Sequence, residues 1–196
     1  MDRSEFLKLL AFAFTSGASP LPSPTGSPAP ASDKWSECDV SPALPYDRPL
    51  GLNMRVLDGP DFDLAKYRGQ AVLLNIFATW CGPCNREMPY VIEAAADYAA
   101  RGLAVVGINS SEKDDTVRAF RKRYGITFPI AMDADGSFVT ALEVGARRQS
   151  DLNFPVTLFV TPKGYLYCDL VGGVGRAELR YRIERFLAAS AGEIKL

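Results

Sequence analysis

Residues 71–89, which read AVLLNIFATWCGPCNREMP, decide the fold of this chain. The first seven, Ala71 to Phe77, are almost all apolar and partly β-branched, which is typical of a strand buried on both faces of a sheet. From Glu87 to Arg101 the sequence is rich in alanine and predicts a helix. Cys81 and Cys84 therefore follow the carboxyl end of a strand and precede a helix, which is where α/β folds place their chemistry.

The rest of the chain continues this alternation of strands and helices. A second buried strand is predicted over 103–109 and a second helix over 114–124. A hairpin is predicted from strands at 156–161 and 165–171. A closing helix is indicated by an apolar stripe of Leu179, Ile183, Phe186 and Leu187. Crossover strands followed by a hairpin and a helix predict an α/β fold with a central mixed β-sheet flanked by helices.

The composition limits the classes of function. The 196 residues are 47% hydrophobic and 23% charged, which are ordinary values for a globular protein. The 22 basic and 23 acidic side chains give a net charge of -1, so no overall field attracts a polyanion and nucleic acid is not an expected partner. Histidine is absent from the sequence, which excludes Ser-His-Asp and Cys-His catalysis and histidine-ligated zinc.

An extension precedes the domain. Its apolar run, Phe6 to Phe14, is much shorter than the ~20 residues that span a bilayer, and the small residues Ser16 to Ala18 resemble a cleavage site. The next stretch is rich in proline, serine and alanine and is expected to be a linker. We expect export, with an unprocessed N-terminus as the alternative. The expected regions are a signal-like or membrane-proximal leader at 1–18, a linker and N-terminal extension at 19–46, and a domain at 47–192.

The spacing of Cys81 and Cys84 favours thiol-disulfide chemistry. Free N–H groups at a helix N-terminus stabilise a thiolate, which makes the first, exposed cysteine a nucleophile near neutral pH. The second cysteine is close enough to attack the mixed disulfide that results. A zinc site would need Cys38 and Cys168 as its other ligands, and a plain structural disulfide is the other alternative. We expect no metal and no cofactor.

The string FATWCGPC, from Phe77 to Cys84, resembles the active site of the thioredoxin superfamily. The wider segments LLNIFATWCGPCNREMP, VVGINSS, ITFPIAMDADG and FPVTLFVTPKG are similar to the extracytoplasmic TlpA/ResA-like branch over about residues 47–190. The resemblance implies a thioredoxin-like fold and a thiol-disulfide oxidoreductase. Many members of this branch are membrane-tethered or periplasmic reductants in cytochrome c maturation or in oxidase assembly.

The resemblance also implies roles for single residues. Cys81 matches the attacking cysteine and Cys84 the resolving one, and the motif residues Trp80, Gly82 and Pro83 surround them. Pro155 matches the loop proline that faces the pair after a cis peptide bond. Such a bond exposes the backbone of Phe154 to a client peptide. The alternative for Pro155 is a plain turn proline.

Two departures from the family pattern concern the surroundings of the pair. Asn75 stands where cytoplasmic thioredoxins carry a buried aspartate, so proton handling must differ. Glu87 matches an acidic residue near the dithiol of ResA-like proteins and is the available substitute. Its alternative is a solvated glutamate in the first turn of the helix. The loop Ala146–Asn153 is longer than usual and would border the active-site surface, or would simply be a solvated loop.

The direction of electron flow is predicted from the residues between the cysteines. Strong oxidants and isomerases usually carry a histidine there, whereas this chain has Gly82 and Pro83, which favours a reductase. A disulfide oxidase or isomerase and a non-enzymatic metal-binding assembly module are the alternatives. A peroxiredoxin is disfavoured because Leu74 and Ala78 stand where its proline and threonine would be.

The resemblance extends to partners, location and the two other cysteines. It implies a disulfide-containing client protein, a membrane electron donor of the thiol-disulfide type and a periplasmic or otherwise extracytoplasmic location. We expect the protein to be a monomer. Parity places Cys168 toward the core, on the strand face of Leu166 and Leu170. Some TlpA-like proteins bond a cysteine before the domain to one after the hairpin, which implies a possible structural disulfide between Cys38 and Cys168. A lone core cysteine is the alternative.

Overall fold

The computed structural model of the chain describes residues 48–145 and 154–191. The predicted leader 1–18, the linker and extension 19–46 with Cys38, and the loop Ala146–Asn153 lie outside the described residues. No helix within the described ranges is both long enough and apolar enough to cross a membrane.

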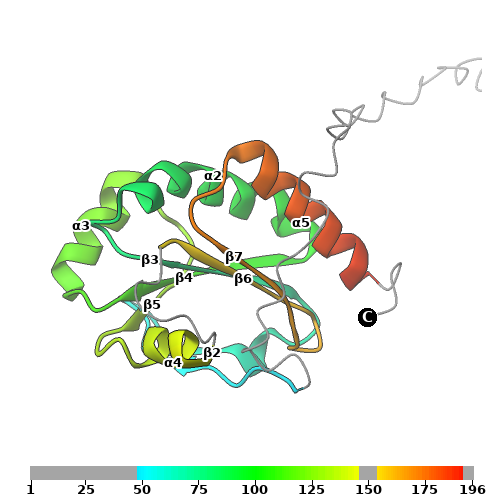
Figure 1. Cartoon of the computed structure of the whole chain (residues 1–196), viewed down its shortest axis with the longest axis horizontal. Coiled ribbons are helices and arrows are strands. Elements are labelled where there is room, and N and C mark those ends of the chain that lie inside the picture. The colour runs from blue at the N-terminus through cyan, green and yellow to red at the C-terminus, as the bar shows by residue number, and fades with distance from the viewer. Residues whose placement is uncertain (1–47, 146–153, 192–196) are drawn as a thin grey trace, which may run out of the picture. The chain divides into compact units, whose positions relative to one another are not determined.

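A mixed sheet forms the centre of the described part of the chain, with five strands in the order β5-β4-β3-β6-β7 (Figure 1). Strand β3 pairs in parallel with β4 and antiparallel with β6, so the strand that leads to the cysteine pair lies in the middle of the sheet. This arrangement confirms the predicted thioredoxin-like α/β fold. The strands are β3 (Ala71–Phe77), β4 (Leu103–Ser110), β5 (Ile130–Asp133), β6 (Val156–Val160) and β7 (Leu166–Val171).

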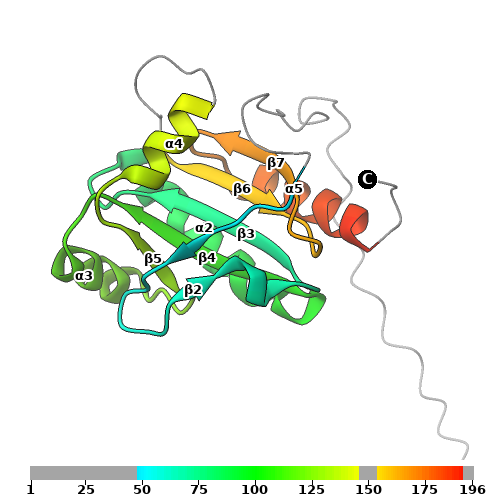
Figure 2. The same cartoon turned by 90° about the horizontal axis from the view of Figure 1, so that it is seen from below.

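Helices cover both faces of this sheet. Figure 1 shows α2 (Gly82–Tyr98), α3 (Asp114–Tyr124) and α5 (Arg176–Ser190) on one face. The other face carries α4 (Ser137–Gly145) and the short strands β1 (Asn53–Met54) and β2 (Phe62–Asp63), which cross in front of the sheet in Figure 2. Two short 3₁₀ helices, η2 (Leu64–Tyr67) and η3 (Ala99–Arg101), complete the described elements.

The continuous apolar run of β3 follows from this two-sided burial. Leu73 and Phe77 pack into the cluster under α2, α3 and α5, whereas Leu74 and Ile76 pack into the cluster under α4 and the β1–β2 hairpin. All seven residues of β3 are buried. Because apolar side chains are required on both faces, the sequence shows no polar alternation.

Cys168 points toward the core and shares its strand face with Leu170, as the sequence predicts, but the expectation that Leu166 lies on the same face is wrong. The register of β6 and β7 shifts between Phe159, which pairs with Cys168, and Val160, which pairs with Leu166. This irregularity inserts one residue and breaks the alternation of faces. Cys168 therefore lies in the cluster under α2 and α5, while Leu166 lies in the cluster on the opposite face of the sheet.

Candidate active site

Cys81 and Cys84 lie at the junction that the sequence predicts, between the end of β3 and the start of α2, and they form a disulfide with a Cα–Cα distance of 5.3 Å. Cys81 is the N-cap residue of α2, and its Sγ accepts a hydrogen bond from the backbone N–H of Cys84 at 3.1 Å. Pro83 has no N–H, so the N–H of Cys84 is the donor that the helix terminus presents to this sulfur. The arrangement favours negative charge on Cys81.

The exposure of Cys81 is smaller than the sequence suggests. In the disulfide form its residue is 5% exposed, compared with 1% for Cys84. Trp80, by contrast, is 71% exposed. The pair is therefore covered, although Cys81 is slightly more exposed than Cys84.

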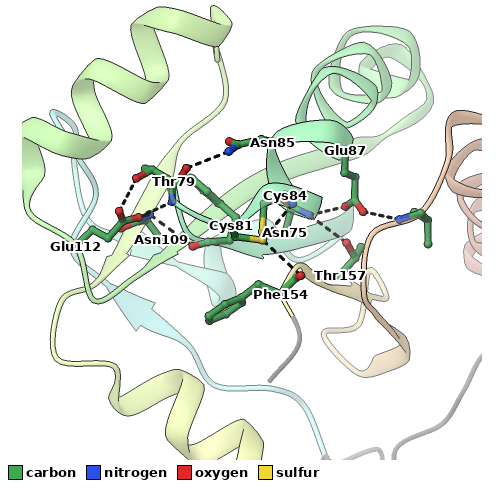
Figure 3. The surroundings of a disulfide bond; sticks show 12 residues. Asn75, Thr79, Cys81, Cys84, Asn85, Glu87, Asn109, Glu112, Phe154 and Thr157 are labelled. Carbon is green, nitrogen blue, oxygen red and sulfur yellow. Dashed lines mark hydrogen bonds between the residues drawn. A yellow bond between two sulfur atoms is a disulfide. The ribbon is translucent and has the colours of Figure 1, made fainter. Parts of the chain in front are cut away.

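The loop that precedes β6 approaches the cysteine pair. The Phe154–Pro155 peptide bond is cis, and the carbonyl oxygen of Phe154 lies 3.4 Å from Cys81 Sγ (Figure 3). In the reduced protein the Cys81 thiol can donate to this oxygen. The rings of Trp80 and Phe154 meet edge to face with centroids 6.1 Å apart. An aromatic pair thus borders the disulfide.

The loop between β7 and α5 approaches the middle of the motif. A Cβ atom added at Gly173 would lie 3.3 Å from Pro83 Cβ, so a glycine lets this loop pack closely against the motif. The backbone N–H of Gly172 donates to the carbonyl of Pro155 at 2.8 Å. Gly82, the other central residue of the motif, is exposed.

Glu87 is buried, so its interpretation as a solvated glutamate is wrong. Its residue is 2% exposed, and Oε1 accepts a hydrogen bond from Asn75 Nδ2 at 3.0 Å. Oε2 accepts from the backbone N–H of Val174 at 2.8 Å. Asn75 Nδ2 also lies 3.2 Å from Thr157 Oγ1. Strands β3 and β6, helix α2 and the β7–α5 loop thus meet at one carboxyl group, on the Cys84 side of the disulfide in Figure 3.

Burial controls the protonation of this carboxyl group. Loss of solvent raises the pKa of Glu87 from 4.5 to about 7, although the hydrogen bonds from Val174 and Asn75 oppose the shift. The charge of Glu178 raises it further. A carboxyl group with this pKa can both accept and release a proton near neutral pH.

A second polar cluster beside the pair was missed in the sequence. Glu112 accepts hydrogen bonds from the backbone N–H of Thr79 and from Asn109 Nδ2, each at 2.7 Å, and also from Thr79 Oγ1. Asn85 Nδ2 donates to the carbonyl of Thr79 at 3.2 Å. The signal was present, because Asn109 and Glu112 lie at the carboxyl end of the parallel strand next to β3.

The two remaining cysteines are Cys38 and Cys168. Cys168 is buried on β7 and is not a free thiol, while Cys38 lies outside the described residues, so their bond stays a prediction. Within the described ranges, no group of three or more histidine, cysteine, aspartate or glutamate side chains could hold a metal ion.

Comparison with known proteins identifies a family that covers most of the chain. The family model described as Redoxin matches residues 24–167. The chain is similar to the thiol-disulfide oxidoreductase ResA of Geobacillus thermodenitrificans, with 32% identity over 128 residues, which cover 65% of this chain and 70% of that protein.

Solved structures show the same fold. A thioredoxin-family thiol:disulfide interchange protein from Chlorobium tepidum is 26% identical, with a TM-score of 0.60 over 71% of this chain and 97% of that one. A secreted disulfide oxidoreductase from Mycobacterium tuberculosis, described as homologous to DsbE of E. coli, is 23% identical, with a TM-score of 0.59 over 69% of this chain and 96% of that one.

Proposed function

Because the chain belongs to the redoxin family, as a TlpA/ResA-like member of the thioredoxin superfamily, we propose that this thiol-disulfide oxidoreductase acts as a disulfide reductase outside the cytoplasm. One observation carries the proposal: Cys81 Sγ caps α2, accepts the Cys84 N–H and lies beside the carbonyl of Phe154. A nucleophilic sulfur, a nearby second sulfur and a backbone surface for a client are thereby brought together.

The reaction proceeds in two exchanges. The Cys81 thiolate attacks one sulfur of the client disulfide, so the client S–S bond breaks, a Cys81–client bond forms and the other client sulfur leaves as a thiolate. Cys84 then loses its proton and attacks Cys81 Sγ, which forms the Cys81–Cys84 disulfide and releases the second client thiolate. Two electrons pass from the dithiol to the client, whose two thiolates take up protons.

Glu87 is proposed to accept the proton of Cys84 in the second exchange. It is buried on the Cys84 side of the disulfide, and its pKa of about 7 allows it to be ionised at the pH at which Cys84 must lose a proton. Asn75 donates to one of its oxygens and holds the carboxyl group in place.

The reducing direction rests on the residues around the thiolate. The position between the cysteines is occupied by Gly82 and Pro83, and histidine is absent from the whole sequence, so no imidazolium stabilises the reduced form. The buried carboxyl group of Glu87 adds no positive charge. A disulfide oxidase or isomerase would need stronger stabilisation of the thiolate than these residues provide.

The proposed partners are those that the resemblance to the TlpA/ResA-like branch implies. The client is a disulfide-containing protein, in cytochrome c maturation or oxidase assembly, and the oxidised pair is reduced again by a thiol-disulfide donor at the membrane. The protein is proposed to be an exported monomer, either free or membrane-tethered.

A direct experiment mixes the reduced protein with an oxidised peptide that carries a Cys-x-x-Cys-His motif, which is the haem-attachment sequence of c-type cytochromes. We expect each protein molecule that becomes oxidised at Cys81 and Cys84 to reduce one peptide molecule, which gains two thiols. The Cys81→Ser variant should produce no peptide thiols. Peptide that stays oxidised, or reduced peptide that the oxidised protein converts to the disulfide instead, would contradict the reductase.

A further inference from the structure

The carboxylate of Glu112 holds the residue that lies two positions before the attacking cysteine. Its Oε2 accepts from the backbone N–H of Thr79 and from Asn109 Nδ2, and its Oε1 accepts from Thr79 Oγ1. Figure 3 shows this cluster on the side of the disulfide opposite to Glu87 in that view. Glu112 takes no part in either of the two proposed exchanges.

The backbone before Glu112 turns sharply in order to place it there. Strand β4 ends at Ser110, and Ser111 adopts a left-handed conformation with a φ of 57°. A residue other than glycine pays a conformational cost there, and such strain collects at functional sites. Close packing holds the turn, because a Cβ atom at Gly136 would lie 2.7 Å from Ser111 Oγ. The chain thus directs Glu112 back toward the β3–α2 loop.

Every backbone polar group of Thr79 is held in this loop. Its N–H donates to Glu112 and its carbonyl accepts from Asn85 Nδ2, which belongs to the first turn of α2. The backbone N–H of Cys81 donates to the carbonyl of Ala78 at 3.2 Å. Hydrogen bonds at Ala78, Thr79 and Cys81 therefore hold the path from the end of β3 to the N-cap of α2.

We propose that Glu112 is a positioning residue, which fixes the turn from Thr79 to Cys81 so that Cys81 Sγ stays at the N-terminus of α2. The inference rests on the proposed function and adds to it a determinant of the reactivity of Cys81. If the turn is released, the sulfur loses its fixed place beside the Cys84 N–H, and the thiolate loses part of its stabilisation.

The contacts of Glu112 and its negative charge are expected to shift the pKa of the Cys81 thiol in opposite directions, so the two effects can be separated by experiment. A negative charge near Cys81 disfavours its thiolate, so removal of charge alone lowers the thiol pKa. Glu112→Gln removes the charge but keeps the contacts: its amide oxygen accepts from Thr79 N–H and Asn109, and its NH₂ donates to Thr79 Oγ1. Glu112→Ala removes the charge and the contacts together.

The experiment measures alkylation of Cys81 by iodoacetamide in the reduced protein from pH 4 to 10, with the modified cysteine identified by mass spectrometry. For Glu112→Ala we expect an apparent pKa of Cys81 raised by about one unit, and alkylation near neutral pH that is about tenfold slower. For Glu112→Gln we expect a rate equal to or above that of the wild type. Thr79→Val, which keeps the N–H contact and loses the hydroxyl, should fall between wild type and Glu112→Ala.

Glu184→Ala is the matched control, because it removes a carboxylate that pairs with Arg101 on the exposed surface. It should leave alkylation unchanged. Unfolding by urea, measured on each variant, shows that the compared proteins are folded. An unaltered rate in Glu112→Ala overturns the proposal, and so does a Glu112→Gln variant that is slowed as much as Glu112→Ala.

These outcomes separate the positioning role from the proposed function. A wild-type protein that releases no thiols from the oxidised peptide, while alkylation of Cys81 still depends on Glu112 as expected, contradicts the reductase and supports the positioning role. A wild-type protein that reduces the peptide, with Cys81 reactivity insensitive to Glu112→Ala, supports the reductase and contradicts the positioning role.

Discussion

Asn75 Nδ2 lies 3.0 Å from Glu87 Oε1 in the core behind the cysteine pair. Asn75 belongs to the central strand β3, and Glu87 belongs to the first turns of α2. An amide on the strand therefore orients a carboxyl group on the helix, where cytoplasmic thioredoxins carry an aspartate on the strand itself. The carboxyl group proposed to accept the proton of Cys84 thus belongs to the helix in this protein and not to the sheet.

The cysteine roles predict which variant traps a client. Cys84→Ser retains the attacking sulfur but cannot release the client, so it should accumulate a covalent adduct with the oxidised Cys-x-x-Cys-His peptide. Cys81→Ser should form none, because Cys84 is more deeply buried. Non-reducing electrophoresis with mass spectrometry measures both. Adduct in Cys81→Ser alone would mean that the roles are reversed.

The proposed role of Glu87 predicts a change in the pH dependence of the second exchange. In the wild type, release of client from the mixed disulfide should accelerate as pH rises through about 7, because Glu87 then becomes able to accept a proton. Glu87→Gln should lose this rise and release client about tenfold more slowly above neutral pH. Stopped-flow measurement at several pH values tests this, and a profile identical to that of the wild type would assign Glu87 a structural role only.

Burial of Glu87 also predicts how stability depends on pH. Its pKa is about 7 in the folded protein and near 4.5 when solvated, so folding favours the protonated form. The contribution of Glu87 to the free energy of unfolding is therefore fully present below about pH 4.5. It is lost as the pH rises through 7, which lowers the free energy of unfolding by about 3 kcal/mol.

Urea unfolding of the oxidised protein at pH 4.5, 6 and 8 measures this effect. Glu87→Gln, which carries no titrating group at this position, is the reference. The difference between the two proteins should grow toward high pH, in favour of Glu87→Gln. A difference that does not change with pH would contradict the raised pKa.

Export predicts a bond between Cys38 and Cys168. Two cysteines outside the active site should pair in an oxidising compartment, and closure of so long a loop should stabilise the fold by about 3 to 5 kcal/mol in the chain-entropy model. Non-reducing peptide mapping of protein purified from the periplasm decides the matter. Two free thiols would contradict the bond and weaken the case for export.

The strands and helices next to the active site could be predicted because their patterns are local. β3 is found at its predicted bounds, 71–77, and α3 at 114–124, since apolar runs and charge order mark both. β5, with only four residues, and the β1–β2 hairpin, with two residues in each strand, are too short for periodicity to indicate them. The bulge in β7 left no signal in the alternation of Cys168 and Leu166.

The site was predictable in part for the same reason. The cysteine pair and Pro155 belong to recognisable motifs, whereas the burial of Glu87 depends on contacts with Asn75 and Val174, which lie 12 and 87 residues away. Such distant contacts cannot be derived from spacing within one helix. Glu112 was missed because its partner Thr79 lies 33 residues earlier, on a different loop.

The redox potential of the Cys81–Cys84 couple tests the reductase most directly. The protein is equilibrated with defined ratios of reduced and oxidised glutathione, and the fraction of disulfide is measured by alkylation and mass spectrometry. We predict a potential of about -270 mV, as expected for a dithiol whose thiolate is weakly stabilised. A potential of about -120 mV would mean that the reduced form is strongly stabilised and would contradict the reductase.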